Sequence, residues 1–227
     1  MFLAESGYFM PFPRGLYHEA LGTVLREAHK KFLEWKRARK LQCSQPRFTW
    51  SRLSRKTRMM YPCLSSKAVA SKVVSHWLCD CAMEFAQRPG ADRTSRLVAT
   101  CLRAYTSTLE VMESAPMVMS QVQAQQYYRG CMVHLQTYAA LHGISRTCTG
   151  KAPNRTMWLL ITKHHHLYEH AKVTLRERWN PACTQLLCAE DWIGRLGRIS
   201  RACHRSAVSK RTMQRYLATL HLELSRL

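Results

Sequence analysis

The sequence predicts an all-α protein, an irregular multi-helix bundle of about seven helices with a basic N-terminal segment. Apolar residues recur at every third or fourth position along most of the 227 residues. Strand-like alternation is scarce, and the chain lacks the β–α–β rhythm of a parallel sheet. Hydrophobic residues make up 46% of the chain, which is enough for a sizeable core and argues against a disordered basic tail.

The first part of the chain predicts a lead, a long helix and a basic linker. Two prolines make the lead irregular. Helical spacing then runs from Leu16 to Leu41 and ends in basic residues, which suit the negative end of a helix dipole. Residues 42–62 lose this spacing and mix basic with aromatic residues, so we predict a linker. Residues 1–62 therefore form a basic helix plus linker, and residues 63–227 a helical domain with basic C-terminal helices.

Capping residues, prolines and glycines bound the remaining helices. Asp92 or Thr94 is the candidate N-cap of the second of them, Gly143 the C-cap of the third and Thr156 the N-cap of the fourth. Asn180-Pro181 marks a stop. The predicted helices span residues 65–87, 92–115, 117–142, 156–179, 190–206 and 208–225, with a loop at 144–155.

Basic charge is concentrated at the two ends of the chain. There are 35 Lys and Arg against 14 Asp and Glu, a net charge of +21. Residues 1–60 hold 13 basic and 4 acidic residues, residues 61–150 hold 8 and 5, and residues 151–227 hold 14 and 5. Such an excess attracts polyanions, because neutralised phosphates release their counterions. We therefore expect a nucleic acid as partner and an intracellular location, nuclear rather than cytoplasmic.

The predicted helix 190–206 has the most informative charge pattern. Its arginines fall on one side of a helical wheel, beside an apolar stripe, and no acid occurs between Asp191 and Glu223. We predict that this stripe, its continuation toward the C-terminus and the basic end of the first long helix contact phosphates. The candidates are Arg195, Arg198, Arg201, Arg205, Lys210, Arg211, Arg215, Lys36, Arg37, Arg39 and Lys40. A solvated basic surface and an acidic protein partner are the alternatives.

A histidine cluster is the candidate metal site. His166 and His170 are four residues apart on a predicted helix, so both imidazoles can face one ion, and zinc is the metal that such a pair would favour. A tetrahedral site needs further ligands, for which Cys183, Cys188 and His204 are available. The chain has no Cys-x-x-Cys pair, and these histidines can equally pack or contact phosphate. We therefore predict no cofactor, with zinc as the alternative.

Sequence signatures of catalysis and of membrane insertion are missing. The chain contains no P-loop, dinucleotide-binding or serine-hydrolase motif. Its three aspartates lie in helical or turn contexts, whereas a two-metal nuclease needs several convergent carboxylates. No run of 18 apolar residues occurs, and the N-terminus does not resemble a secretory signal. We expect no membrane contact, reduced cysteines that mostly pack in the core, and no enzymatic activity.

Several residues of the C-terminal half resemble a known pattern. They are Met157-Trp158, Thr162-Lys163-His164-His165-His166-Leu167, His170, Asn180-Pro181 and Glu190-Asp191-Trp192-Ile193-Gly194-Arg195. The pattern is similar to that of uncharacterised proteins abundant in some protist genomes, which look like parts of mobile-element or transposase genes. The resemblance covers roughly residues 95–220, with Thr162 in place of a proline and Trp192 in place of a phenylalanine. It implies the C-terminal helical part of a larger element protein, without a catalytic domain.

Together these observations predict a non-enzymatic, basic helical protein that binds nucleic acid non-specifically through phosphate contacts. An inactive or metal-binding fragment of a transposase-like enzyme is one alternative, and a helical interaction module for an acidic partner is another. A decayed reading frame without a selected role is also compatible with the sequence.

Overall fold

Helices form the regular structure of the chain, as predicted. The computed structural model describes residues 1–147, 156–184, 199–203 and 207–224. Within these ranges it contains eight helices and no strand, close to the expected bundle of about seven helices. They are α1 (Phe2–Glu5), α2 (Tyr17–Ala38), α3 (Ala68–Ala86), α4 (Arg93–Ser114), α5 (Gln121–Thr147), α6 (Thr162–Glu177), the 3₁₀ helix η1 (Pro181–Thr184) and α8 (Val208–Leu224). In the described part of the chain, no helix is both long and apolar enough to cross a membrane.

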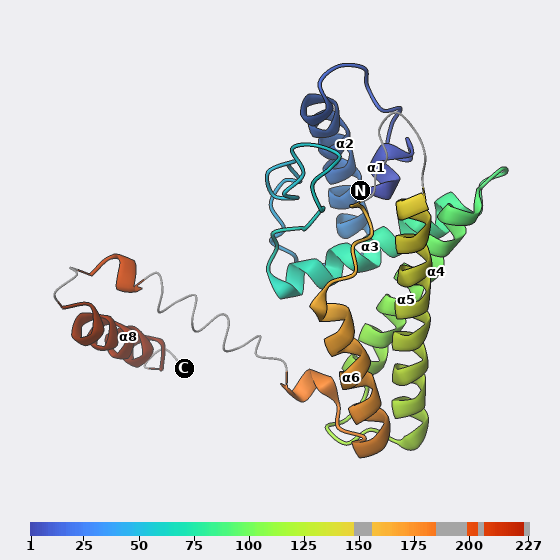
Figure 1. Ribbon diagram of the computed structural model, residues 1–227. Helices are drawn as coiled ribbons and strands as arrows, with labels where there is room; N and C mark the ends of the chain where they lie inside the picture. The colour runs from blue at the N-terminus through green and yellow to red at the C-terminus, as the bar shows by residue number, and fades with distance from the viewer. Residues whose placement is uncertain (148–155, 185–198, 204–206, 225–227) are drawn as a thin grey trace. The chain divides into compact units, whose positions relative to one another are not determined.

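The chain forms two compact units, Met1–Cys183 and Thr184–Leu227. In the first unit, the long helices α4, α5 and α6 lie alongside one another, and α3 crosses them near the end that holds α1 and α2 (Figure 1). This division differs from the boundary that the sequence suggests near residue 62. The reason is that the segment before α3 shares its hydrophobic core with α3.

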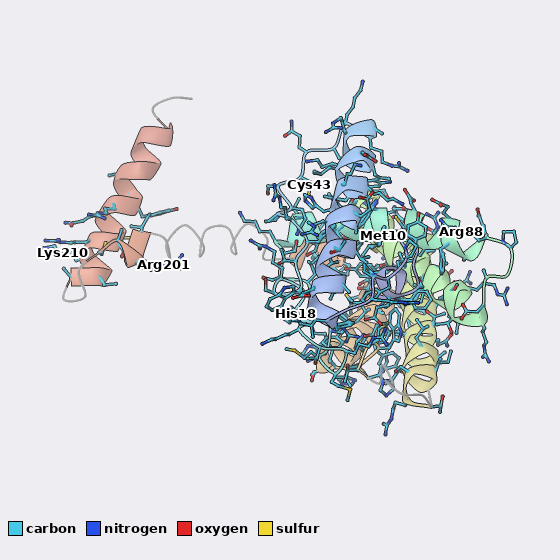
Figure 2. The ribbon with its side chains drawn as sticks, turned by 90° about the horizontal axis from the view of Figure 1, so that it is seen from above. Met10, His18, Cys43, Arg88, Arg201 and Lys210 are labelled. Carbon is cyan, nitrogen blue, oxygen red and sulfur yellow. The ribbon has the colours of Figure 1, made fainter. Side chains whose placement is uncertain are left out.

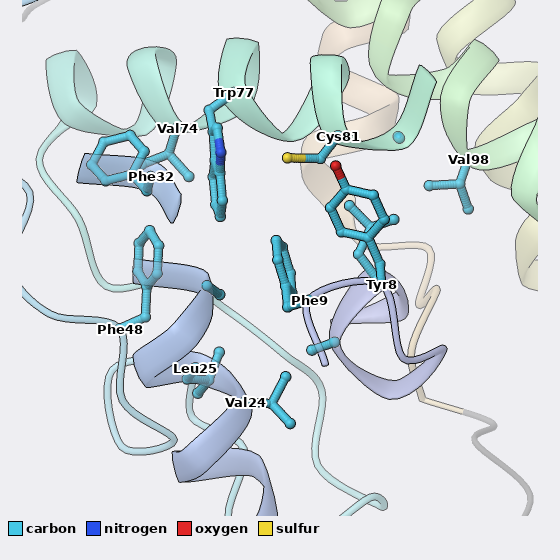
Figure 3. Close-up of a cluster of buried hydrophobic side chains, with 14 of the residues drawn as sticks. Tyr8, Phe9, Val24, Leu25, Phe32, Phe48, Val74, Trp77, Cys81 and Val98 are labelled. Carbon is cyan, nitrogen blue, oxygen red and sulfur yellow. The ribbon is translucent and has the colours of Figure 1, made fainter. Parts of the chain in front are cut away.

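An aromatic cluster joins the N-terminal segment to α3 (Figure 3). The Trp77 ring of α3 stacks on Phe9 at 5.5 Å and on Phe48 at 5.7 Å between ring centroids. Phe32 of α2 meets the same indole edge-on at 5.3 Å. These four side chains are buried. Residues 42–62 lack a regular helix, as predicted, but because Phe48 lies in the core they are a packed part of the unit and not a spacer.

The apolar lead is ordered, which differs from the irregular start that its prolines predict. Residues Phe2–Glu5 form α1, and Leu3 and Ala4 of this helix are buried in the same core. Pro11 and Pro13 come later, between α1 and α2. The prediction was wrong because the two prolines disrupt only their own part of the chain and not the apolar residues that precede them.

A completely buried arginine connects four segments of the first unit. The Arg55 guanidinium lies 3.2 Å from Glu5 Oε1 in α1, and Arg55 Nε donates to Tyr17 Oη of α2 at 3.2 Å. It also donates to the Met60 carbonyl and, at 3.5 Å, to Thr156 Oγ1. Tyr17 Oη donates to Glu5 at 2.5 Å, and burial together with this bond raises the pKa of Tyr17 to about 12. Arg55 therefore fixes the position of the loop against both N-terminal helices.

Polar caps set the bounds of α4. Asp92 is its N-cap, as predicted, and accepts a hydrogen bond from the Ser95 backbone at 2.7 Å. After the C-terminal end, the buried Asn180 donates to the carbonyls of Met112 at 2.8 Å and Ala115 at 2.9 Å. Helix α6 ends at Glu177, where Arg178 adopts a left-handed conformation, so Asn180-Pro181 lies beyond the helix, as the predicted stop requires.

The bounds of α5 and α6 differ from the predicted ones. Helix α5 begins only after Ser120, whose backbone N–H donates to Gln123 Oε1 at 2.9 Å while its hydroxyl accepts from the Gln123 N–H at 3.2 Å. It then continues through Gly143 to Thr147, so Gly143 is not its C-cap. Thr156 is not an N-cap either. It donates to the Arg58 carbonyl at 3.2 Å, and α6 begins at Thr162.

In the second unit, α8 coincides with the predicted final helix. Of the helix predicted at 190–206, only residues 199–203 are described, and of these residues 199–201 are helical. Arg215 of α8 donates to the Ala202 carbonyl at 3.2 Å. This bond and one from Thr212 to Cys203 connect α8 to the residues before it.

Candidate nucleic-acid interface

The predicted C-terminal phosphate contacts are exposed where they are described. Arg201, Lys210, Arg211 and Arg215 all lie on the surface of the second unit (Figure 2 labels Arg201 and Lys210). Arg211 and Arg215 are four residues apart on α8 and therefore share one helix face. The other members of the predicted stripe lie outside the described residues. These are Arg195, Arg198 and Arg205.

The predicted basic end of α2 is divided between bound and exposed side chains. Arg39 pairs with Asp80 of α3 at 2.8 Å, and its guanidinium lies 4.6 Å from the Trp35 ring centre. Lys36 Nζ donates to the Cys43 carbonyl at 3.0 Å. Arg37 and Lys40 are exposed. Two of these four predicted contacts thus have intramolecular partners, and the other two face solvent.

The segment at 42–62 adds basic residues of two kinds. Arg52 and Lys56 are exposed, and neither forms an ion pair within the described ranges. Arg55 and Arg58 instead turn toward Glu5, with Arg58 Nε 3.9 Å from its carboxylate. The sequence does not predict which of these four residues is buried, because nothing in their spacing distinguishes one from another. Only the structure shows which of them can meet a partner.

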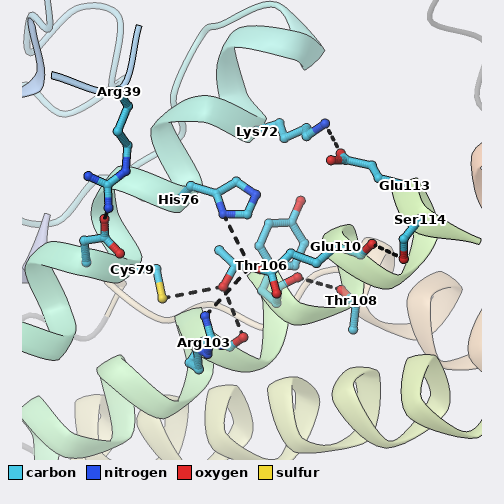
Figure 4. A network of polar contacts seen from close by, with 12 residues as sticks. Arg39, Lys72, His76, Cys79, Arg103, Thr106, Thr108, Glu110, Glu113 and Ser114 are labelled. Atoms are coloured by element: carbon cyan, nitrogen blue, oxygen red, sulfur yellow. Dashed lines mark hydrogen bonds and ion pairs between the residues drawn. The ribbon is translucent and has the colours of Figure 1, made fainter. Parts of the chain in front are cut away.

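Acidic residues neutralise much of the basic charge on α3 and α4 (Figure 4). Lys72 pairs with Glu113. Glu110 lies 3.8 Å from Arg103 and 3.9 Å from His76. Such exposed pairs add little stability, but they cancel the local potential. The surface around Glu110 and Glu113 is therefore a poor site for a polyanion.

The predicted metal ligands lack a third partner in the described part of the chain. His166 and His170 are both exposed on α6, one turn apart. No group of three His, Cys, Asp or Glu side chains that could hold a metal ion occurs among the described residues. Cys188 and His204 lie outside those residues. The neighbouring His164 has a structural role, because its Nδ1 accepts from the Ile161 N–H at 3.1 Å at the start of α6.

A buried cysteine and a partly buried histidine lie side by side, as a nucleophile and its base would. Cys101 Sγ lies 3.4 Å from His134 Nδ1, which also bonds the Cys101 carbonyl at 3.0 Å. Burial raises the pKa of Cys101 to about 11 and lowers the pKa of His134. Both groups are thus neutral near pH 7, whereas a catalytic cysteine needs a lowered pKa. Cys101 is a core thiol, as predicted for most cysteines, and Cys79, Cys81 and Cys131 are likewise buried.

We expect acidification from pH 7 to pH 5 to destabilise the fold through His134. Its folded pKa lies below the ordinary 6.5, so only the unfolded chain takes up the proton as the pH falls through that value. The free energy of unfolding then falls with pH, by at most about 1.4 kcal/mol per pH unit for one histidine. Urea unfolding at pH 7, 6 and 5 measures this slope. His134→Gln should reduce it and the exposed His165→Gln should not; equal slopes in both variants would contradict the assignment.

A concave site that the sequence does not predict lies between α2 and the segment that follows it. Gly22, Arg26 and His29 of α2 and residues 47–50 line a cavity of about 420 Å³. The only hint in the sequence is the mixture of basic and aromatic residues around Trp50. Such a mixture does not show which of them converge.

Comparison of the chain with protein-family models, with curated proteins and with solved structures gives no match.

Proposed function

We propose that this protein binds nucleic acid through non-specific contacts to the phosphate backbone. One observation carries the proposal. Exposed basic side chains without carboxylate partners among the described residues occur after α2 and on α8, near the two ends of the chain, whereas Lys72 of α3 and Arg103 of α4 are paired with acids. The phosphate contacts that we assign are Arg37, Lys40, Arg52, Lys56, Lys210 and Arg211, together with the exposed Arg215.

The charge of these segments supports backbone contacts more than base recognition. Lysine and arginine on α8 and after α2 offer positive charge and donors, which phosphates accept irrespective of base sequence. The segment from residue 192 to 222 contains no acid that would repel a phosphate. We therefore expect the affinity for nucleic acid to depend strongly on salt concentration and weakly on base sequence.

We expect the affinity for duplex DNA to fall steeply as salt is added. Each neutralised phosphate contributes about −0.9 to the slope of log K against log salt concentration, so three to seven contacts give a slope between about −3 and −6. Fluorescence anisotropy with a labelled duplex of arbitrary sequence, titrated at several salt concentrations, measures the slope. A slope near zero would overturn the proposal.

Two double variants localise the contacts. Lys210→Gln with Arg211→Gln removes two exposed charges from α8 and should make the slope less steep by about 1.8. The control, Lys172→Gln with Arg176→Gln, removes the same charge from α6, where both side chains form ion pairs with glutamates. The control should leave the slope unchanged. An equal effect of the two variants would mean that net charge, and not a defined surface, drives binding.

An acidic protein partner is the second candidate function. Met213 and Leu217 of α8 are 52% and 55% exposed and lie four residues apart, beside the basic residues. A helix with adjacent apolar and basic residues is suited to an apolar groove with an acidic rim. Met213→Ser with Leu217→Ser separates the two functions, because it should weaken such docking and leave the salt slope of DNA binding intact.

A further inference from the structure

The cavity beside α2 is built by one helix face and one turn. Gly22, Arg26 and His29 are spaced by four and three residues and therefore share a face of α2. Gly22 lies close to the Trp50 indole, since a Cβ there would make an ordinary contact with Trp50 Cδ1 at 4.0 Å. The indole edge also meets the His18 ring, at 5.9 Å between centroids.

Local hydrogen bonds hold the opposite wall. Thr49 Oγ1 accepts from the Arg52 N–H at 3.2 Å, and the Leu53 N–H donates to the Thr49 carbonyl at 3.1 Å. Phe48, the neighbour of Thr49, is anchored in the aromatic core. Arg47 and Trp50 thus stand on a turn whose backbone is fixed on both sides of Thr49.

Two guanidinium groups at this cavity lack an acidic partner. Arg26 and Arg47 are exposed, one on α2 and one on the turn. Arg26 bonds Thr23 Oγ1 at 3.1 Å, and neither arginine forms an ion pair within the described residues. No carboxylate lines the cavity. An anion that enters it would meet positive charge from both walls.

The imidazole of His29 is a third group at this cavity that a bound anion would affect. His29 Nε2 is buried and has no hydrogen-bond partner among the described residues. Burial lowers the pKa of His29, and the charges of Arg47 and Lys36 lower it further. A negative charge bound beside this ring would favour its protonated form, in which both nitrogens are donors.

We infer that this cavity binds a phosphate monoester that carries a flat ring, as a nucleotide does. Arg26 and Arg47 supply the phosphate contacts, and the Trp50 indole supplies an apolar surface for the ring. A volume of about 420 Å³ lies within the range of about 300–1,000 Å³ that small-ligand sites occupy. The site contains none of the residues assigned to duplex binding. This inference can therefore be tested independently of the proposed function.

Calorimetric titration of the full chain tests the site with adenosine monophosphate, inorganic phosphate and adenosine as probes. We expect saturable binding of the nucleotide, weaker binding of phosphate and weaker binding still of the nucleoside. Arg26→Gln with Arg47→Gln should lower the nucleotide affinity roughly tenfold or more, since two charged hydrogen-bond donors are lost. Arg93→Gln with Arg129→Gln removes the same net charge from exposed positions on α4 and α5 and should change the affinity less than about twofold.

The outcomes separate the site from its alternatives. Absence of saturable nucleotide binding, or equal losses in the two double variants with unchanged thermal unfolding, would overturn the inference. Phosphate that binds as tightly as the nucleotide would overturn the role of Trp50. A single-stranded oligonucleotide then identifies the source of the phosphate. If the cavity variant also weakens its binding, the ligand is an unpaired nucleotide of a strand; if not, it is a free nucleotide, and both results support the site.

Discussion

Replacement of Arg55 by alanine is expected to lower the free energy of unfolding by about 3–5 kcal/mol. The guanidinium is fully buried and faces the largely buried Glu5 carboxylate at 3.2 Å. Its removal takes a cationic partner from Glu5 and hydrogen-bond donors from Tyr17 Oη and the Met60 carbonyl. Urea unfolding followed by circular dichroism measures the loss.

Three further variants show whether the buried contacts cause this effect. The exposed Arg52→Ala in the same segment should change the free energy of unfolding by less than about 0.5 kcal/mol. Arg55→Lys keeps the charge but not the fork of donors, so it should retain only part of the stability. Glu5→Gln combined with Arg55→Met should be more stable than Arg55→Ala, because it leaves no unpaired charge. A small effect of Arg55→Ala would show that the network does not stabilise the N-terminal segment.

Truncation of Trp77 to alanine is expected to cost about 3–5 kcal/mol of unfolding free energy. This indole is 3% exposed and contacts rings from the lead, from α2 and from the loop at residue 48. A cavity at this point therefore loosens three segments from α3 at once. Chemical denaturation measures the change in unfolding free energy.

The control for Trp77 is a tryptophan outside the core. Trp179 is 50% exposed, and Trp179→Ala should cost less than about 1 kcal/mol. Limited proteolysis adds a local readout, since the Trp77→Ala chain should be cut first between α2 and α3. Similar costs for the two tryptophans would contradict a shared aromatic core.

The helices could be predicted from the sequence because their signals are local. Periodic apolar residues locate α2, α3, α4 and α8, and Asp92 marks a true N-cap. Signals that depend on tertiary contacts were misread. Gly143, for example, lies within α5 and does not end it. Helical spacing also does not place every apolar residue in the core, since Val69 and Val122 are 59% and 62% exposed. Periodicity shows which residues share a helix face, but how much of that face is buried depends on how the helices pack.

The candidate sites show the same limit. The sequence predicts a basic surface, and the exposed Lys210 and Arg211 agree with it. It does not predict that Asp80 neutralises Arg39, since these residues are distant in the chain and meet only where α2 contacts α3. The sequence also does not predict that Arg47 lies beside α2 at one cavity. The resemblance to mobile-element proteins remains a prediction.

The ion pairs on α3 and α4 also have a kinetic consequence. A phosphate backbone beyond the Debye length, about 10 Å at 0.1 M salt, responds mainly to charge that is not already cancelled at short range. Glu110 and Glu113 offset the bases around them in this way, whereas the exposed Arg52 and Lys56 after α2 have no ion pair among the described residues. Encounters with a polyanion should therefore favour such unpaired positions, with an association rate that slows as ionic strength rises. The acidic residues of α4 would thus influence how the chain is oriented toward the polyanion before any contact forms.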